Sequence, residues 1–269
     1  MYKVSEVRDR VKYFKNLYEA RYILLSLTRQ DLKNKYRNSL LGVAWNFFSP
    51  LGIVLIIGLV YSVVFNTPLK ELVPYLFSGL LPWIFFTSSA EGGALSFLSS
   101  QGYIKQTQVP IEIFPLRASI VNFVNLLISL AAFFLLYIFI DPGSFGFNML
   151  YIFPALIIWL LFCSAWATIS SIVNLYIRDF QPLQSLVLQG FFYLSPIIYK
   201  PEMMDSRNFQ WVYLLNPFYY FLEIIRWPLL GKNIPGWRTW MICIIITLLL
   251  IQVSIILINK IGRKITFRL

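Results

Sequence analysis

Residues 31–51 read DLKNKYRNSLLGVAWNFFSPL, in which a basic segment runs directly into a long apolar stretch. The basic segment and the residues before it have the spacing of an amphipathic helix. Its apolar and basic side chains fall on separate helical faces, namely Leu17, Ala20, Leu24 and Leu27 on one and Arg29, Lys33 and Arg37 on the other. We expect a helix over 17–37 that lies along a membrane surface, as a simple anchor or as a docking surface.

The rest of the chain is dominated by apolar runs. Of 269 residues, 58% are hydrophobic and 13% are charged, and several runs approach the ~20 residues that cross a bilayer. This predicts an all-α membrane protein with a 1–40 N-terminal segment and a single transmembrane domain over 41–269. The six predicted spans are about 43–65, 73–97, 116–140, 151–176, 182–199 and 239–258. Pro82 predicts a break or tilt in the second span, and Pro182 and Pro196 do so for the fifth.

Positive charge sets the predicted orientation. The first 40 residues hold ten Lys and Arg residues, and the tail 259–269 holds four. Because such residues concentrate on the cytoplasmic side, we expect both termini there. The net charge of +11 then reflects topology and contact with anionic membrane lipids, and we expect no nucleic-acid partner. We also expect no signal peptide, because the first 40 residues lack a short apolar core.

The composition argues against an enzyme. The chain has no histidine, and Cys163 and Cys243 lie within apolar runs, which predicts buried thiols instead of metal ligands. The carboxylates predicted on the outer side have no recognisable catalytic motif around them. A membrane-bound transferase is therefore disfavoured, and we expect no metal site and no catalytic residue.

Residues 214–230 are apolar enough for a seventh span but are bracketed by Pro217 and Pro228. Glu223 and Arg226 fall on one helical face, and a seventh crossing would put the basic tail outside. We predict a re-entrant or interfacial external hairpin between the fifth and sixth spans. A plain loop packed on the bundle is the alternative. The candidate gate residues are Asn216, Pro217, Glu223 and Arg226.

Five motifs resemble one family. Besides residues 31–51, these are FPLRASIVNFVNLLISL (114–130), IVNLYIRDFQPL (172–183), YLSPIIY (193–199) and LNPFYYFLEIIRWPLLG (215–231). Together and in this order they are similar to ABC-2 type permeases that export polysaccharides. The resemblance implies a homodimer paired with two copies of a separate nucleotide-binding ATPase subunit, which binds ATP and Mg. The chain lacks a P-loop, since its Gly231–Lys232 pair is followed by Asn233.

The resemblance also implies which residues couple the permease to the ATPase. The candidates are Arg29, Asp31, Lys33, Tyr36 and Arg37 in the surface helix, and Arg178 and Asp179 between the fourth and fifth spans. The 101–115 connection, with Lys105, Glu112 and Pro115, would be a third cytoplasmic element. Without the family, a solvated helix end or a local ion pair is the better explanation of Arg178 and Asp179, and the resemblance is what favours coupling.

Aromatic residues make up 18% of the chain, and rings can stack on the apolar faces of sugars. Core, lipid-facing or interfacial positions explain many of them more simply. The pathway candidates are Trp45, Phe47, Phe48, Tyr61, Phe191, Phe192 and Tyr193, with Trp83, Phe85 and Phe86 as further candidates. Polar residues within spans should face the interior, where they touch substrate or join helices. They are Asn46, Ser49, Glu91, Asn122, Asn125 and Gln189.

The resemblance implies export of a lipid-linked polysaccharide, in the first place O-antigen on undecaprenyl diphosphate, across the bacterial cytoplasmic (inner) membrane. A capsular polysaccharide or teichoic acid exporter is an alternative, and an ABC-2 exporter of drugs or lipids is a further one. Basic residues near the inner rim could attract the diphosphate, although contact with lipid headgroups explains them equally well. They are Arg8, Arg10, Lys12, Lys15 and Arg37.

Overall fold

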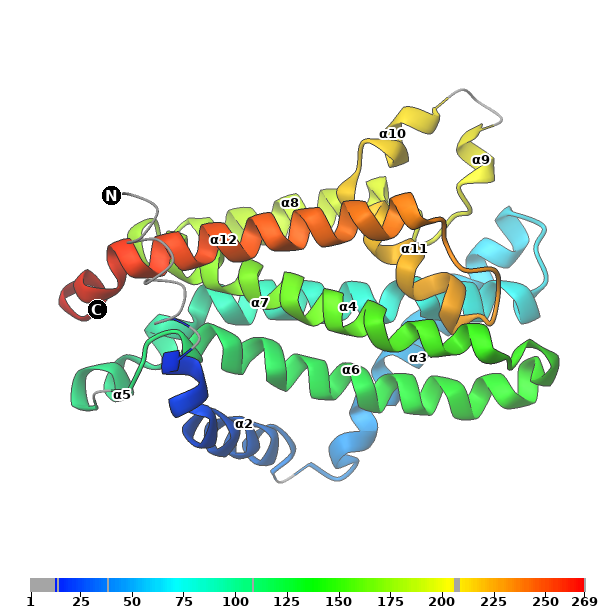
Figure 1. Ribbon diagram of the computed structural model, residues 1–269. Helices are drawn as coiled ribbons and strands as arrows, with labels where there is room; N and C mark the ends of the chain where they lie inside the picture. Colours follow the sequence, from blue (N-terminus) through cyan, green and yellow to red (C-terminus); the bar gives the residue numbers. More distant parts are fainter. Residues whose placement is uncertain (1–12, 14, 38, 108, 206–208, 269) are drawn as a thin grey trace.

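The computed structural model describes residues 13, 15–37, 39–107, 109–205 and 209–268, and within these ranges it contains helices and no strand (Figure 1). The helices are α2 (Arg21–Tyr36), α3 (Trp45–Val64), α4 (Leu69–Ser99), α5 (Gln101–Gln106), α6 (Ile113–Ile140), α7 (Ile152–Tyr176), α8 (Phe180–Leu194), α9 (Glu202–Asp205), α10 (Gln210–Leu214), α11 (Pro217–Leu229) and α12 (Trp237–Arg268). Three short 3₁₀ helices are η1 (Gly42–Ala44), η2 (Pro142–Ser144) and η3 (Phe147–Tyr151). The predicted all-α fold is confirmed.

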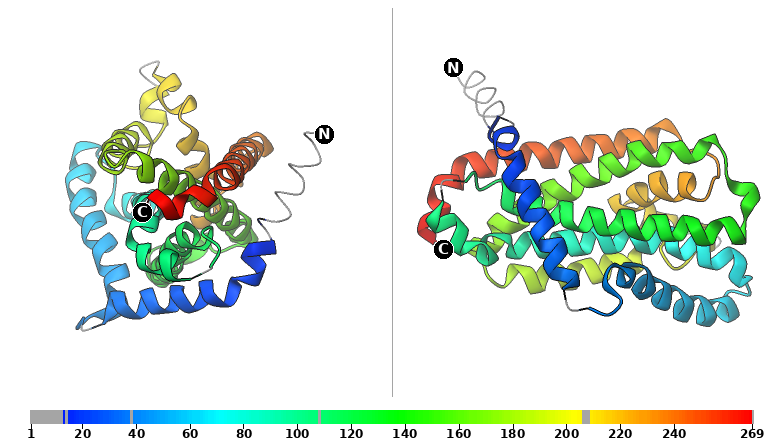
Figure 2. Two further views of the ribbon diagram at one scale, coloured as in Figure 1. Left: turned by 90° about the vertical axis from the view of Figure 1, so that its left-hand side faces the viewer. Right: turned by 90° about the horizontal axis from the view of Figure 1, so that it is seen from below.

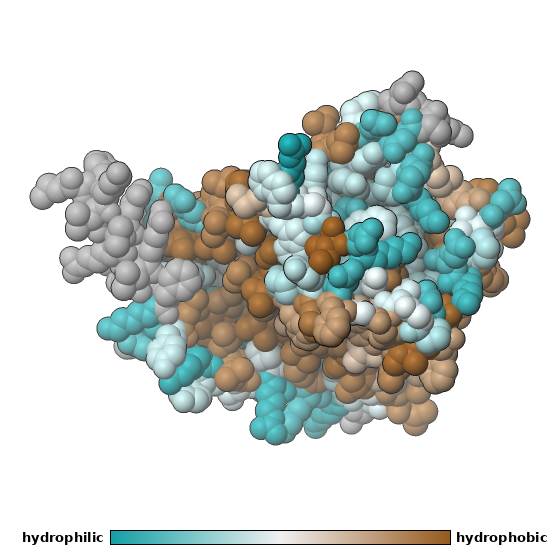
Figure 3. All heavy atoms as spheres, turned by 45° about the vertical axis from the view of Figure 1, so that its right-hand side comes forward, coloured by the Kyte–Doolittle hydropathy of each residue, from teal (hydrophilic) through white to brown (hydrophobic). Residues whose placement is uncertain are grey.

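Five segments are long and apolar enough to cross a membrane, which makes the chain a multi-pass membrane protein. They are Gly42–Val64, Leu69–Ser99, Ile113–Ile140, Phe147–Tyr176 and Trp237–Ile261. These match the first four predicted spans and the sixth to within about four residues at most ends. Large apolar areas also lie on the outer surface of the bundle, as Figure 3 shows for one face.

The predicted fifth span is shorter than expected. Helix α8 has 15 residues and ends at Leu194, and Ser195 after it is extended. Pro196 follows at once, and the residue before a proline is disfavoured in helical geometry. At 1.5 Å per residue α8 measures about 22 Å, short of the ~30 Å hydrocarbon core. The prediction of a helix to residue 199 was therefore wrong, since the SPIIY stretch leaves the helix.

The second span is one continuous helix, so of the break or tilt predicted from Pro82 the break is wrong. Pro74 and Pro82 both lie inside α4, and both are buried. A proline in a helix loses one backbone hydrogen bond, but packing on all sides can hold the helix together. Helix α4 packs against α3, α6, α7, α8 and α11, and it is the central element of the bundle.

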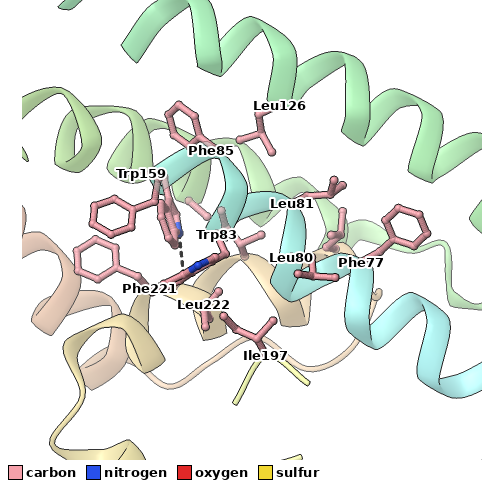
Figure 4. Packing of buried hydrophobic residues seen from close by; sticks show 14 of the residues in the cluster. Phe77, Leu80, Leu81, Trp83, Phe85, Leu126, Trp159, Ile197, Phe221 and Leu222 are labelled. Carbon is pink, nitrogen blue, oxygen red and sulfur yellow. Dashed lines mark hydrogen bonds between the residues drawn. The ribbon is translucent and has the colours of Figure 1, made fainter. Parts of the chain in front are cut away.

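Aromatic side chains fill the core around α4 (Figure 4). Trp83 and Phe86 are buried in this core, which contradicts the expectation that they line a pathway, whereas Phe85, although buried, borders a cavity. The indole nitrogen of Trp159 donates a hydrogen bond to the carbonyl oxygen of Phe221 at 2.8 Å, which ties α7 to α11. The two cysteines are free and buried, as predicted.

Helix α2 runs across the bundle, and the left view of Figure 2 shows it nearly perpendicular to the long helices. Ala20 and Leu27 are buried, and Leu17 and Leu24 pack against the same apolar cluster. Arg29, Lys33 and Arg37 are exposed. The predicted amphipathic helix is confirmed, with its regular part at Arg21–Tyr36.

The 214–230 region also forms a helix, not an irregular loop. Helix α11 packs against α4, α7 and α12, and it lies at the end of the bundle that carries the α3–α4 and α6–α7 connections (Figure 1). Its position inside the bundle brings the charged residues of α11 among helices that span the membrane.

Candidate functional site

An ion pair attaches the surface helix to the bundle. The guanidinium of Arg117, through Nε and Nη2, donates to both carboxylate oxygens of Asp31. The pair joins α2 to the first turns of α6 and is only partly exposed. A two-pronged pair of this kind fixes orientation as well as distance. Sequence analysis did not single out Arg117, although a cation just inside a predicted span calls for an anionic partner.

A second connection joins the end of α2 to α3 and α6. The hydroxyl of Tyr36 donates to Oδ1 of Asn125 at 2.6 Å, and Asn46 Nδ2 donates to the same oxygen at 3.0 Å. Asn46 also donates to the Tyr36 hydroxyl oxygen. Ser129 Oγ then donates to the carbonyl oxygen of Asn46 at 2.6 Å. Three helices therefore share one small polar network, so a displacement of α2 would move α3 and α6 with it.

The remaining coupling candidates are free to meet a partner. Arg178 and Asp179 are exposed in the turn between α7 and α8, at the end of the bundle where α5 and the C-terminus lie (Figure 1). Within the described residues neither has an ion-pair partner. Asp31 and Tyr36, by contrast, point into the bundle, so their contacts suit transmission of movement more than contact with another subunit.

The candidate residues of the 101–115 connection differ in their exposure to solvent. Lys105 is exposed on α5, whereas Glu112 and Pro115 are buried. Asn16 Nδ2 donates to the Glu112 carboxylate at 3.4 Å, which brings the segment before α2 close to this connection. Among the basic residues proposed for the inner rim, Lys15 is exposed and lies 3.8 Å from Glu19. The others in the N-terminal segment, Arg8, Arg10 and Lys12, lie outside the described residues.

Four of the six polar residues predicted to face the interior come together at one cavity. It has a volume of about 350 Å³, and Asn46, Ser49, Asn122 and Asn125 line it. Partial burial lowers the pKa of Lys35, which lies at the margin of the same cavity. The other two residues, Glu91 and Gln189, are exposed in the single chain, which corrects the expectation that they face the interior of the bundle.

The aromatic pathway candidates lie on α3 and α8 and divide by exposure. Trp45, Phe48 and Tyr193 are 52%, 47% and 62% exposed. The other candidates, Phe47, Tyr61, Phe191 and Phe192, are half-buried. The rings of Phe191 and Phe218 lie 5.2 Å apart, so part of α8 is fixed against α11.

The gate candidates at the start of α11 form its N-terminal cap. Oδ1 of Asn216 accepts a hydrogen bond from the backbone N–H of Phe218 at 3.0 Å, and Pro217 is the first helical residue. Both features favour a helix start. Nδ2 of Asn216 donates to Ser195 Oγ at 2.8 Å. The cap therefore also joins α11 to the chain that leaves α8.

The charged gate candidates form a buried cluster with α4. Arg226 is 1% exposed, and its Nη1 lies 3.7 Å from Glu223 Oε1. Nη1 also donates to the Tyr75 hydroxyl oxygen at 2.9 Å, and Nε donates to Ser78 Oγ at 3.3 Å. The guanidinium carbon lies 4.1 Å from the centre of the Tyr75 ring. Burial raises the pKa of Glu223, and the nearby Arg226 charge opposes this effect.

Tyr75 extends this cluster to the segment after α8. Its hydroxyl donates to the carbonyl oxygens of Pro196 and Tyr199, at 3.1 and 2.8 Å. Sequence analysis missed Tyr75 and Ser78, although their spacing of three residues on a predicted helix places them on one face. The cluster ties α4, α11 and the 195–199 segment together at one end of the bundle.

Comparison with known proteins places these features in context. A family model described as ABC-2 type transporter matches residues 22–230. The chain is 29% identical over 209 residues to a Myxococcus xanthus protein named O-antigen export system permease protein RfbA, covering 77% of this chain and 80% of that protein. It is 28% identical over 196 residues to a Klebsiella pneumoniae protein of the same name, covering 72% and 75% of the two chains.

Proposed function

The chain belongs to the ABC-2 type transporter family, and we propose that it is the membrane-spanning subunit of an exporter of lipid-linked polysaccharide. The substrate we propose is O-antigen carried on undecaprenyl diphosphate. The relatives named O-antigen export permeases, which match over most of both chains, support this choice. Capsular polysaccharide or teichoic acid is the second candidate, since the same motifs are shared among such exporters.

We propose that a separate nucleotide-binding subunit, in two copies, binds ATP and Mg and supplies the energy. The observation that carries this proposal is the double attachment of α2 to the bundle, through Asp31–Arg117 and through Tyr36, Asn46 and Asn125. A surface helix held this rigidly transmits a push. The exposed Arg29, Lys33 and Arg37 on α2 are the side we propose for contact with that subunit.

Arg178 and Asp179 supply a second contact in this proposal. They are exposed at a tight turn between two packed helices, so a force on the turn acts on α7 and α8 together. Switching transitions of this kind move rigid elements against one another. We infer that nucleotide binding in the partner subunit shifts this turn and α2 in a concerted way.

The topology we propose has six spans in the bacterial cytoplasmic membrane, with α8 as a short fifth span and both termini in the cytoplasm. The ten cationic residues among the first 40 support this orientation. Helix α11 would then enter from the outer side as a re-entrant element. Its 13 residues measure about 20 Å, and a crossing at α11 in addition to α8 would carry the basic tail 259–269 to the outer side.

The pathway we propose runs between two copies of this chain, along α3 and α8. Only 17% of the apolar window of Gly42–Val64 is buried inside the chain, so a long face of this span is left for another surface. Glu91 and Gln189 are exposed on the neighbouring helices, and polar groups at membrane depth favour a protein or aqueous environment over lipid. Trp45, Phe48 and Tyr193 would present rings to a passing sugar polymer.

The outer gate in this proposal is the cluster around Arg226. Its hydrogen bonds hold α11 against α4 and against the segment after α8. Opening an exit would require these contacts to move as a unit. Separating the buried Glu223–Arg226 pair would leave two buried charges unpaired at a high free-energy cost, which favours a closed resting state.

Co-purification tests the proposal. The tagged chain is co-expressed with a candidate nucleotide-binding ATPase subunit, isolated, and placed in lipid with and without lipid-linked polysaccharide. We expect a stable complex whose ATP hydrolysis changes when polymer is added. A chain that purifies alone, or a complex whose ATPase rate ignores the polymer, would contradict it.

A further inference from the structure

The cavity between α3, α4 and α6 has a lining suited to a hydroxylated ligand. Six of its residues carry an amide or a hydroxyl: Asn46, Ser49, Ser88, Asn122, Asn125 and Ser129. No carboxylate lies among its lining residues. Apolar and aromatic side chains from α3, α4 and α6 form most of the remaining wall, among them Trp45 of α3 and Phe85 of α4. A sugar ring has the same division, with hydroxyls around its edge and C–H groups on its faces.

Several of these polar groups lack partners within the protein. The side chains of Ser49, Ser88 and Asn122 make no hydrogen bond with another described residue. Ser49 is exposed and the other two are half-buried, whereas Nδ2 of Asn125 is buried without an acceptor. An unpaired polar group at membrane depth is costly, most of all when it is buried as Nδ2 of Asn125 is. The cavity therefore keeps donors and acceptors available for something that enters it.

A cation lies at the margin of the cavity. Lys35, near the end of α2, contributes to the lining, and none of the described carboxylates pairs with it. Its ammonium lies 5.5 Å from the centre of the Tyr36 ring. A lysine beside a polar cavity at the level of a surface helix suits a phosphate group attached to the ligand.

The volume limits the size of the ligand. At about 350 Å³ the cavity is at the lower end of the ~300–1,000 Å³ range of ligand pockets. This is enough for one sugar ring with part of its phosphate, and too little for a polymer. The cavity lies within one chain, and Trp45 borders both the cavity and the pathway proposed between two copies, so a ligand held here would lie at the edge of that pathway.

We propose that this cavity binds the headgroup of an anionic glycolipid, with one sugar ring among the asparagine and serine side chains and the phosphate at Lys35. This rests on the proposed function, and it names the part of the lipid-linked substrate that is recognised first. A glycerol phospholipid headgroup shares hydroxyl and phosphate chemistry, and the test separates the two sources.

Binding to the full chain in nanodiscs of neutral lipid tests the proposal. The probes are undecaprenyl diphosphate bearing one hexose, undecaprenyl diphosphate without sugar, and phosphatidylglycerol. Two or three hydrogen bonds to the ring should make the hexose-bearing lipid bind about tenfold more tightly than the bare diphosphate. Equal affinity for these two lipids in the wild-type chain would overturn the proposal, as would equal binding of phosphatidylglycerol.

Two neighbouring residues on α4 provide the matched variants. Ser88→Leu fills the cavity and should reduce the preference for the hexose to about onefold. Thr87→Leu places the same leucine side chain at the next position, but Thr87 does not line the cavity and its hydroxyl donates to the carbonyl oxygens of Trp83 and Ile84, so the preference should remain. Equal loss in both variants would count against the site. If Ser88→Leu folds poorly, Asn122→Ala provides the second test, with loss of the preference expected and an unchanged preference contradicting the site.

Failure of this site and failure of the proposed function give different results. If the wild-type chain with its ATPase exports polymer but shows no preference for the hexose, the exporter remains and the site is wrong. If the complex exports no polymer while the preference is present, the site is retained and the function is wrong.

Discussion

Replacing Glu223 by Gln should destabilise the protein strongly, because it leaves the Arg226 charge buried without a counter-charge. Glu223 and Arg226 are 8% and 1% exposed. Removing one partner of such a pair costs about 3 to 5 kcal/mol. Arg226 keeps its contacts with Tyr75 and Ser78, so we expect the lower end, about 3 kcal/mol. Glutamine also keeps an oxygen that can accept the hydrogen bond from Trp227.

This loss corresponds to a fall in Tm of about 6 to 12 °C for a chain of this size. Size-exclusion chromatography of heated, fluorescently tagged protein in detergent measures it. Glu71→Gln is the matched control, because Glu71 lies 3.8 Å from Lys200 at the surface, where the two side chains are 64% and 44% exposed. Such an exposed pair contributes at most about 1 kcal/mol, so the Tm should change little.

The double variant Glu223→Gln with Arg226→Met decides whether the pair is coupled. It removes the unpaired charge, so its loss should be smaller than the sum of the single losses, by at least about 1 kcal/mol. A Tm of Glu223→Gln no lower than that of Glu71→Gln would refute the reasoning. Simple additivity of the two single variants would refute it as well.

Three further predictions concern coupling, pathway and packing. Arg178→Glu should leave the amount of folded protein and the ATPase rate of the complex unchanged but stop polymer export; export at the wild-type rate would remove this turn from the coupling path. Trp45→Ala should slow export by more than it lowers the amount of folded protein. Trp83→Ala, in the core, should instead lower the free energy of unfolding by about 3 to 5 kcal/mol. If Trp45→Ala lowers export and the amount of folded protein in parallel, the Trp45 ring is structural. Gly93→Ala should lower the Tm, because an added Cβ would lie 2.5 Å from the Cα atom of Ala167, whereas Gly92→Ala, whose nearest neighbour would be 3.4 Å away, should melt near the wild type; equal melting temperatures would contradict the close α4–α7 contact.

Composition and periodicity were sufficient for the coarse fold. Long apolar runs predicted six spans, and five of them are helices long and apolar enough to cross a bilayer. The amphipathic helix was predicted because its two faces separate at helical spacing. Pro82 misled the prediction, because local propensity favours a break, and the packing that keeps α4 continuous involves residues far away in the sequence.

Several residues of the site were predicted individually, but the hydrogen bonds that join them were not. The sequence indicated that Asn46 and Asn125 should face the interior, but not that both meet Tyr36. Arg226 was a candidate, whereas Tyr75, which holds it, lies about 150 residues earlier in the chain. Side-chain partners so distant in sequence leave no local pattern. Helical periodicity also did not predict which aromatic side chains are exposed, as the buried Trp83 and the exposed Trp45 show.

ATP-dependent movement of lipid-linked polysaccharide tests the central claim most directly. The chain and its ATPase partner are reconstituted into vesicles with labelled polymer on the side of the nucleotide-binding subunit, and polymer protected inside the vesicle is measured. We predict accumulation that requires ATP and that Arg178→Glu abolishes while ATP hydrolysis continues. Accumulation without ATP, or none from an intact complex that hydrolyses ATP, would contradict the account.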